Sequence, residues 1–373
     1  MMFLDGVRVL DLSRVLAGPL ATQILGDMGA DVLKVEAPFG DDTRRWGPPF
    51  QDDMAAYFQS CNRNKNSLVL NLKDPQDQET LRRLIQKADV LIDNFPPKVR
   101  DRLGLKSEEL NRLKSDLIHL SITGYGGERI HEPGYDVMIQ AESGFMGITG
   151  PKEGEPHKVG VAIVDVLTGM MSANAILAAL FRREKHRVGA RLDISLFQTA
   201  LFSLVNVTTN HLVTGKPNRR WGNAHPNLFP YQSFEALDGP IVIGTGNNAQ
   251  YKRLCSVLGI TGELTELEDH QRLEQRDSLL PIIQDKLRTK TVQELLSDLR
   301  THQIPCAPIL RPDEALAQSG KWNEDTLIAV DHNQLGNIRL VNNPIQSDGM
   351  RTDHLPPPQL GEGGEAMARQ WLS

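Results

Sequence analysis

The chain has 373 residues, of which 40% are hydrophobic and 24% charged, a composition typical of a globular protein of one or two domains. Its 41 basic and 47 acidic residues give a net charge of −6, and this lack of a basic excess argues against a nucleic-acid partner. The three cysteines lie far apart and form no CxxC pair, which argues against a disulfide framework and against a zinc site.

The N-terminal residues MMFLDGVRVLDL lead directly into a strand pattern, so no signal or transit segment is expected. No apolar stretch of about 18 residues runs without polar interruption, so no membrane span is expected. Unpaired cysteines suit a reducing compartment. Together these features predict a cytoplasmic protein.

The first part of the chain alternates short apolar runs with amphipathic helix patterns. Strands are expected at 8–13, 31–38, 67–72, 89–95 and 117–123, and helices at 19–29, 75–88 and 106–114. Such alternation predicts an α/β fold, in which helices cover both faces of a Rossmann-like parallel sheet.

The remaining elements indicate a second, smaller domain. Residues 166–183 and about 194–214 predict two long, largely buried helices. A hairpin at 231–245 turning at Asp238-Gly239, helices at 249–258, 268–289 and 291–302, and a strand at 306–310 indicate an α+β domain. Another hairpin is expected within 326–347, before a short final helix. We therefore expect residues 1–220 to form a large domain, 221–325 a small one, and 326–373 to return to the large domain.

One carboxylate, Asp165, interrupts the apolar and small residues of VGVAIVDVLTGMM at 159–171. An ionised aspartate is costly to bury without compensation. Asp is also a favoured helix N-cap, because its side chain accepts hydrogen bonds from free backbone N–H groups. The local pattern leaves both interpretations open, a helix cap and a functional carboxylate.

Familiar catalytic motifs are absent. The loop SRVLAGP after the first strand lacks the GxGxxG glycines of dinucleotide-binding proteins, and the chain has no Walker loop. The ten histidines show no HExxH spacing, and no GxSxG elbow is present. Neither a metal site nor a conventional nucleophile is supported, and a nicotinamide-dependent oxidoreductase is disfavoured.

Basic and amide side chains occur near several predicted strand ends. Ligands of parallel α/β sheets bind outside the carboxyl ends of the strands, and Arg14, Lys73 and Asn94 fall just past such ends. Each residue alone is most simply a solvated surface group. As a set they favour a phosphate-bearing ligand; the basic members are Arg14, Lys34, Arg63, Lys65, Lys73 and Arg102.

Seven sequence segments, spread over nearly the whole chain, occur in the order in which a known protein family has them. They are LDGVRVLDLSRVLAGPLATQILGDMGADVLKVE, NRNKNSLVLNLKDP, DVLIDNFPP, SITGYG, PGYDVMIQAESGFMGITG, VGVAIVDVLTGMMSANAILAALF and PPPQLGE. With them the chain resembles the class III (CaiB/BaiF) CoA-transferases, which include formyl-CoA transferase and crotonobetainyl-CoA:carnitine CoA-transferase. The segments GDDTRRWGPPF, RRWGNAHPNLFPYQSF and GTGNNAQY are most similar to the succinyl-CoA:glutarate (dicarboxylate) branch.

The resemblance implies that Asp165 is the catalytic residue. In this family an aspartate attacks an acyl-CoA thioester and carries CoA as a covalent aspartyl intermediate to a carboxylic acid. The resemblance therefore implies coenzyme A thioester as a co-substrate, with no tightly bound cofactor, and succinyl-CoA with a dicarboxylate as the expected pair. It also implies an interlocked homodimer.

Positions similar to the family's CoA-binding residues can be carried over one by one. They are Val15, Leu16, Ala17, Lys73, Asn94, Phe95, Arg102, Gly124 and Tyr125. Tyr57 is a candidate for the thioester channel, and Arg220 and His225 are candidates for a distal carboxylate of the acceptor. Each of these also has an ordinary structural interpretation, as a core aromatic or a turn.

The chain departs from the formyl-CoA transferase pattern. Ala37 and Thr123 stand where that relative has arginine and lysine, and its tetraglycine loop is absent, with GTGNNAQ at 244–250 as a possible counterpart. The racemases of the same family carry a GHD motif, whereas this chain has Gly134-Tyr135-Asp136. The missing histidine makes a racemase less favoured than a transferase. A non-catalytic acyl-CoA-binding protein is a third alternative.

Overall fold

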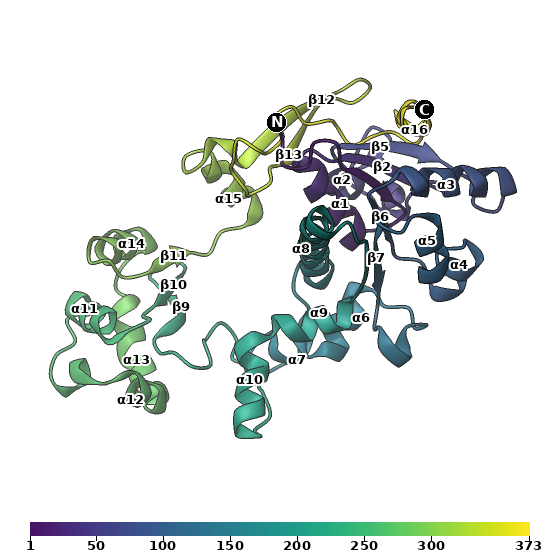
Figure 1. The fold of residues 1–373 in the computed structure, drawn as a ribbon. Helices are drawn as coiled ribbons and strands as arrows, with labels where there is room; N and C mark the ends of the chain where they lie inside the picture. The colour runs from purple at the N-terminus through teal and green to yellow at the C-terminus, as the bar shows by residue number, and fades with distance from the viewer. The chain divides into compact units, whose positions relative to one another are not determined.

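The structure is a computed structural model that describes residues 1–373. The chain folds into two compact units (Figure 1). The large unit comprises residues 1–146, 158–217 and 320–373, and the small unit comprises residues 147–157 and 218–319. The segment 147–157, which the sequence pattern leaves within the first domain, thus groups with the small unit.

A six-stranded parallel sheet forms the centre of the large unit, as predicted. Its order is β5 (Lys65–Val69), β2 (Asp31–Glu36), β1 (Arg8–Asp11), β6 (Val90–Asp93), β7 (Ile118–Thr123) and β8 (Ala190–Ser195). After β1 the chain adds β2 and β5 toward one edge of the sheet, and after β6 it adds β7 and β8 toward the other edge. The order therefore reverses between β1 and β6, and the carboxyl ends of these two strands flank a natural ligand crevice.

Side chains of alternate residues on each strand enter different cores. On β1, Val9 packs in the core beneath α1 (Ala17–Asp27) and α8 (Ile163–His186), whereas Leu10 packs in the opposite core beneath α3 (Pro75–Lys87). Trp371 of α16 (Gly364–Leu372) is buried in this second core. The C-terminal segment therefore completes the large unit.

The strand β8 and the helices after it correct the sequence interpretation. Residues 194–214 are not one buried helix: β8 ends at Ser195, followed by α9 (Leu196–Ser203) and α10 (Val205–Thr214). The Ser195 hydroxyl starts α9 by accepting a hydrogen bond from the Gln198 N–H. None of the residues of α10 is buried, so the burial predicted from its apolar side chains is wrong.

The helix α8 is longer than predicted and packs closely against α1. A Cβ on Gly169 would come within 2.8 Å of the Ala17 carbonyl oxygen, so only glycine permits this approach. By length and composition α8 is the one helix that could cross a membrane, and in this fold it packs against α1, α6 (Asp136–Ser143) and α9. Its close contact with α1 brings the first turn of α8 toward the loop that follows β1.

Shorter elements complete the large unit. They are β3 (Phe50–Gln51), β4 (Met54–Ala55), α2 (Ala56–Ser60), α4 (Pro97–Arg102), α5 (Ser107–Leu113), and the hairpin of β12 (Leu327–His332) and β13 (Gly336–Val341). The hairpin turns at Gly336, as predicted. α7 (Phe145–Ile148) spans the boundary between the two units along the chain.

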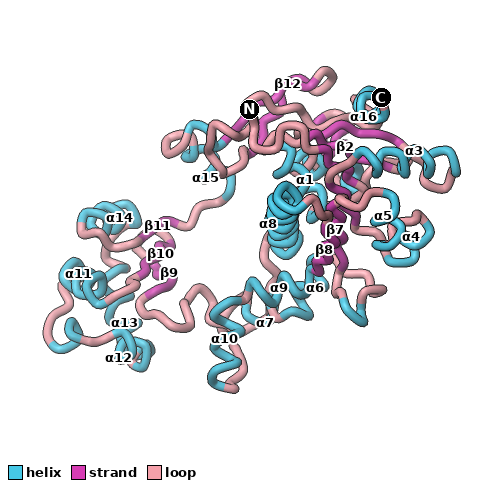
Figure 2. Tube along the Cα trace, viewed as in Figure 1, coloured by secondary structure: helices cyan, strands magenta, loops and turns pink.

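The small unit is an antiparallel three-stranded sheet covered by helices. Figure 2 shows its strands in magenta and its helices in cyan. The strand order is β11 (Cys306–Pro308), β10 (Pro240–Gly244) and β9 (Tyr231–Glu235), and the predicted turn at Asp238-Gly239 is confirmed. The helices are α11 (Asn248–Leu258), α12 (Asp269–Glu274), α13 (Arg276–Leu287), α14 (Val292–Thr301) and α15 (Pro312–Ser319). The helix expected over 268–289 is broken at Gln275.

Candidate active site

Asp165 lies in the first turn of α8, and its side chain does not cap the helix. The N-cap position is Ala162, and no side chain within the helix makes a capping hydrogen bond. The Asp165 carboxylate accepts no hydrogen bond and forms no ion pair, although the residue is half-buried. The interpretation of Asp165 as a simple helix cap is therefore wrong.

Asp136, from the start of α6, performs the capping instead. Its Oδ1 accepts hydrogen bonds from the Val164 N–H at 2.8 Å and from the Asp165 N–H at 3.3 Å. Its Oδ2 accepts a hydrogen bond from the Gln140 Nε2 at 2.5 Å. Two of the N–H groups that α8 leaves free at its N-terminus are thus satisfied by a carboxylate from another helix.

Two electrostatic effects act on the Asp165 carboxyl. Burial and the neighbouring negative charge of Asp136 raise its pKa to about 7. Both effects disfavour the ionised form, because the carboxylate is partly withdrawn from solvent and has no counter-ion. Strongly perturbed carboxyl groups in a cavity are typical of functional sites.

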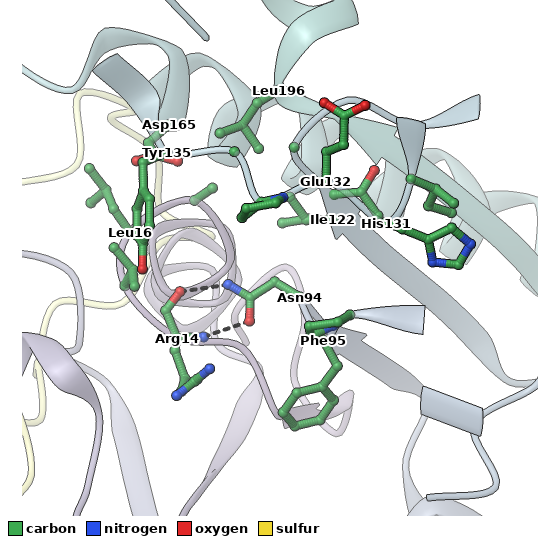
Figure 3. Close-up of a pocket in the computed structure, with 18 of the residues that line it drawn as sticks. Arg14, Leu16, Asn94, Phe95, Ile122, His131, Glu132, Tyr135, Asp165 and Leu196 are labelled. Atoms are coloured by element: carbon green, nitrogen blue, oxygen red, sulfur yellow. Dashed lines mark hydrogen bonds between the residues drawn. The ribbon is translucent and has the colours of Figure 1, made fainter. Parts of the chain in front are cut away.

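A cavity of about 260 Å³ opens in front of Asp165, at the carboxyl edge of the sheet (Figure 3). It brings together Val15, Leu16, Ala17, Asn94, Phe95 and Gly124 from the positions similar to the family's CoA-binding residues. Arg14, Asp42, Pro96, Ile122, Thr123, residues 130–135 and Leu196 complete the lining. The cavity thus occupies the crevice between β1 and β6 that the strand order predicts.

The loop that follows β1 is held rigidly at this edge. Asn94 accepts a hydrogen bond from the Arg14 N–H at 3.1 Å and donates one to the Arg14 carbonyl at 2.8 Å, as Figure 3 shows. The next residue, Val15, has a φ of +74°, a left-handed conformation that is strained for a β-branched residue. Its N–H faces both carboxylate oxygens of Asp41 at 3.3 Å.

Asp41 is itself fixed by a buried ion pair. The Lys34 ammonium lies 2.9 Å from the Asp41 carboxylate and also donates to the Ser13 carbonyl at 2.8 Å. Burial alone would raise the pKa of Asp41, but Lys34 and the hydrogen bonds from Thr43 outweigh it and hold this pKa at about 2. Lys34 therefore stabilises the loop from within the core and does not face the cavity.

Two other basic candidates are also part of the core. Lys65 pairs with Asp11 at 3.2 Å, and Arg63 pairs with Asp27 at 2.6 Å, with all four side chains buried. Their position near strand ends suggested a ligand, but their charges are already compensated within the protein. Sequence spacing could not reveal this, because the partners come from other elements.

Several other predicted site residues lie away from the cavity. Lys73 is exposed beyond β5, and Arg102 lines a separate hollow with Arg82 and Arg112. Tyr125 is buried and donates its hydroxyl to Glu142 at 2.9 Å. In this structure the predicted CoA-binding set is therefore divided between the cavity and other surfaces.

Tyr57 lies near Asp165 without lining the cavity. Burial and the nearby Asp165 charge raise the pKa of Tyr57 to about 12, so its phenol stays protonated at neutral pH. Its ring packs edge-on against Trp46, with 5.3 Å between the centroids. A protonated phenol beside Asp165 is available as a hydrogen-bond donor.

Arg220, His225 and the GTGNNAQ segment belong to the small unit. The Arg220 guanidinium donates to the carbonyls of Pro151 and Gly154, and His225 accepts a hydrogen bond from the Asn227 N–H. In GTGNNAQ, Asn247 caps α11 by accepting the Gln250 N–H at 3.0 Å. These contacts give each a structural role within its own unit.

The position of the racemase histidine is occupied by Tyr135, which lines the cavity and is 59% exposed. His131 also lines the cavity, but Figure 3 shows its ring pointing away from Asp165. No group of three or more His, Cys, Asp or Glu side chains could hold a metal ion.

Two functional candidates were missed by the sequence interpretation. Asp136 was noted only as part of the Gly134-Tyr135-Asp136 triplet, and Asp41 was not considered. A carboxylate in the first turn of a helix, as Asp136 is in α6, is a recognisable signal, but nothing local indicates that it caps a different helix. For Asp41 the sequence offers no signal beyond the turn-forming Asp41-Asp42-Thr43.

Comparison with known proteins identifies the family of the chain. The model of the family "CoA-transferase family III" matches residues 4–363. The chain is 39% identical to the succinate–glutarate CoA-transferase of Agrobacterium fabrum, over 96% of this chain and 93% of the relative. It is 37% identical to the succinyl-CoA:glutarate CoA-transferase of Mus musculus, over 96% of this chain and 84% of the relative.

The fold agrees as well. The crystal structure of a CAIB/BAIF family protein from Brucella suis superposes with a TM-score of 0.85 at 37% identity, covering 99% of both chains. The chain therefore belongs to CoA-transferase family III. It is an enzyme, a CoA-transferase, which uses a coenzyme A thioester as co-substrate.

Proposed function

We propose that the enzyme transfers CoA from succinyl-CoA to a dicarboxylic acid through covalent intermediates on Asp165. The observation that carries the mechanism is the half-buried Asp165 carboxylate, which accepts no hydrogen bond and belongs to the lining of the cavity. The choice of donor and acceptor rests on the names of the relatives from Agrobacterium fabrum and Mus musculus.

In the first step, an oxygen of ionised Asp165 attacks the thioester carbonyl. The carbon–sulfur bond breaks and CoA leaves as the thiolate, so a mixed anhydride joins Asp165 to the acyl group. The thiolate then attacks the Asp165 carbonyl and releases the donor acid as a carboxylate, leaving an aspartyl-CoA thioester. The acceptor carboxylate reverses these two steps, and the covalent route divides one difficult exchange into easier ones.

The cavity supplies three conditions for this chemistry. Leu16, Ile122 and Leu196 contribute apolar walls, which limit the water that would hydrolyse an anhydride. The helix α1 begins at Ala17 in the cavity lining, and the free N–H groups of its first turn favour a developing anion. The rigid Arg14–Asn94 contact keeps this loop in place during both attacks.

The direct test is detection of the aspartyl adduct. Wild-type enzyme incubated with succinyl-CoA, without acceptor, should gain the mass of CoA less one water, and peptide mapping should place it on Asp165. Asp165→Ala should fold normally, form no adduct and lose CoA transfer by at least about 10³-fold, the scale seen on loss of a nucleophile. An adduct on another residue, or full turnover by Asp165→Ala, would disprove the mechanism.

The acceptor is tested separately, with a panel of glutarate, oxalate, other dicarboxylates and their monoamides. The proposal expects a dicarboxylate to exceed its monoamide in kcat/KM by at least about tenfold, since a hydrogen bond to a charged group is worth about 1.5–3 kcal/mol. Equal rates for acid and monoamide would show that no second carboxylate is recognised.

We also propose that a second copy of the chain covers α9 and α10. Phe202, Leu212 and Val213 are 73%, 80% and 79% exposed, and apolar side chains so exposed along adjoining helices are typical of an interface. Light scattering should give twice the chain mass of 41.5 kDa. A monomer at micromolar concentration would contradict the proposal.

A further inference from the structure

The contacts of Asp136 connect three separate segments of the large unit. Its Oδ1 holds the first turn of α8, and its Oδ2 accepts a hydrogen bond from Gln140. Gln140 is fully buried and accepts the Val159 N–H at 2.8 Å, in the segment that leads into α8. Asp136 therefore determines where α8 begins and how Asp165 is presented.

The same carboxylate removes the support that a helix N-terminus normally offers to Asp165. N–H groups in the first turn stabilise a nearby anion. Here Asp136 accepts the Val164 and Asp165 N–H groups, and Asp165 itself accepts none. Two carboxylates thus lie at one helix end, and only one of them is compensated.

The other titratable side chains near Asp165 do not reverse this imbalance. They are Tyr57 on α2 and, along the cavity, Arg14, Asp42, His131, Glu132 and Tyr135. The cationic Arg14 is paired with Asp42 at 3.3 Å, and none of these groups forms an ion pair with Asp165. Asp136 is the one charged side chain that acts on Asp165 beyond the effect of burial.

We propose that Asp136 is a positioning residue for CoA transfer: its carboxylate fixes the first turn of α8, and its negative charge favours acylated Asp165 over the free carboxylate. This inference rests on the proposed function. The charge effect follows from the balance of the reaction. Asp165 enters as an anion and becomes a neutral aspartyl-CoA thioester, while the negative charge leaves with the released donor acid. Repulsion between the two carboxylates therefore acts on the free enzyme and disappears in the intermediate.

Two substitutions separate the two roles of Asp136. Asp136→Asn keeps an oxygen that can cap α8 but removes the charge, together with the oxygen that accepts from Gln140 Nε2. Asp136→Glu keeps the charge but displaces the capping oxygen by one methylene. Glu184→Gln is the matched control, because it removes one negative charge from the far end of α8, at a side chain that is 76% exposed. It lies about 29 Å from Asp165 along the helix axis.

The first measurement is the equilibrium amount of aspartyl-CoA adduct formed with excess succinyl-CoA, read by intact mass. Asp136→Asn should lower the ratio of adduct to free enzyme about tenfold, as expected when the carboxylate becomes more stable by about one pKa unit. Glu184→Gln should leave this ratio unchanged. Asp136→Glu should approach the wild-type ratio at equilibrium but reach it more slowly, since the nucleophile is misplaced.

The second measurement needs no substrate. Carbodiimide labelling of Asp165 against pH reports its protonation, and Asp136→Asn should move the midpoint to lower pH by about one unit. A midpoint that does not move, or an unchanged adduct ratio, would overturn the inference. If Asp136→Asn does not fold, the test rests on Asp136→Glu. Adduct formation by Asp136→Glu at the wild-type rate would then overturn the positioning role.

The outcomes also separate this inference from the function on which it rests. Absence of any adduct in the wild-type enzyme would contradict the proposed function, whatever the labelling midpoints show. If the wild-type enzyme forms the adduct and Asp136→Asn forms the same amount, the proposed function stands and only the inference is contradicted.

Discussion

Gly124, which directly follows the strand β7, lies in backbone contact with Gly134. Gly134 precedes Asp136 by two residues. A Cβ on Gly124 would come within 2.8 Å of the Gly134 backbone, and a Cβ on Gly134 within 2.7 Å of the Gly124 Cα. This contact docks the Gly134-Tyr135-Asp136 segment against the sheet. The sheet thereby determines the position of Asp136 and, through it, the start of α8.

Gly134→Ala should therefore destabilise the protein and impair the active site together. Forcing a methyl group into a packed contact costs about 1–3 kcal/mol, which urea denaturation can measure. CoA transfer should fall more than stability alone explains, because Asp136 is displaced. Gly320→Ala is the control, since a Cβ there meets no atom within 4 Å. Equal stability of the two variants would contradict the close contact.

The rate of adduct formation should increase with pH through the pKa of Asp165, about 7. Only the ionised carboxylate attacks the thioester, and an ordinary aspartate would already be ionised near pH 5. Single-turnover measurement between pH 5 and 9 with succinyl-CoA would reveal the midpoint. A rate that is flat from pH 5 upward would show that Asp165 has an unperturbed pKa.

The raised pKa of Asp165 also affects protein stability: the rate of adduct formation should rise with pH, whereas stability should fall. Because the folded-state pKa lies above the unfolded value, the folded protein binds more protons between about pH 4 and 7, and stability decreases as pH rises through this range. Asp165→Asn should therefore be more stable than the wild type at pH 8, by up to about 2–4 kcal/mol, and about equal at pH 4. Thermal or urea unfolding at both pH values tests this, and an asparagine variant that is less stable at pH 8 would contradict it.

Lys34→Met should cost about 3–5 kcal/mol of stability, because it leaves the Asp41 carboxylate buried without its partner. The double variant with Asp41→Asn should recover part of that loss. Lys252→Met, which breaks the exposed pair with Glu266 in the small unit, should change stability far less, because solvent screens this pair. A small effect of Lys34→Met would mean that Asp41 is compensated by other groups.

Asn94→Ala should raise the KM for the CoA ester by about tenfold or more, with a smaller change in protein stability. Its side chain makes both hydrogen bonds to the Arg14 backbone, and their loss frees the loop that lines the cavity. Steady-state kinetics with succinyl-CoA, compared with a thermal melt of the same variant, would separate the two effects. An unchanged KM would indicate that the loop keeps its place without Asn94.

The parallel sheet could be predicted from the sequence because each strand is a local apolar run between turn signals. The strand β8 was missed because ARLDIS carries charges at Arg191 and Asp193 and reads as surface. It becomes a strand by pairing with β7 along its whole length. The helix α10 was misread for the opposite reason, since its apolar residues suggest burial but are exposed in this chain.

The candidate site divides in the same way. Val15, Asn94 and Gly124 follow strands of one parallel sheet, so their meeting at one edge could be expected from strand order alone. The burial of Lys34 and Lys65 could not be expected, because their partners Asp41 and Asp11 are separated from them in sequence and meet them only in the fold.

The sequence by itself determined the α/β architecture, the family and the placement of Asp165 in an apolar helical segment, since each depends on local pattern or on motifs in a constant order. Only the tertiary structure decided that Asp165 is not the cap of its own helix. That role passes to Asp136, which lies 28 residues before Val164 and reaches it because Gly134 packs on Gly124. Hydrogen bonds and charge repulsion act over a few ångströms, so they are set by positions in space that no local stretch of sequence specifies.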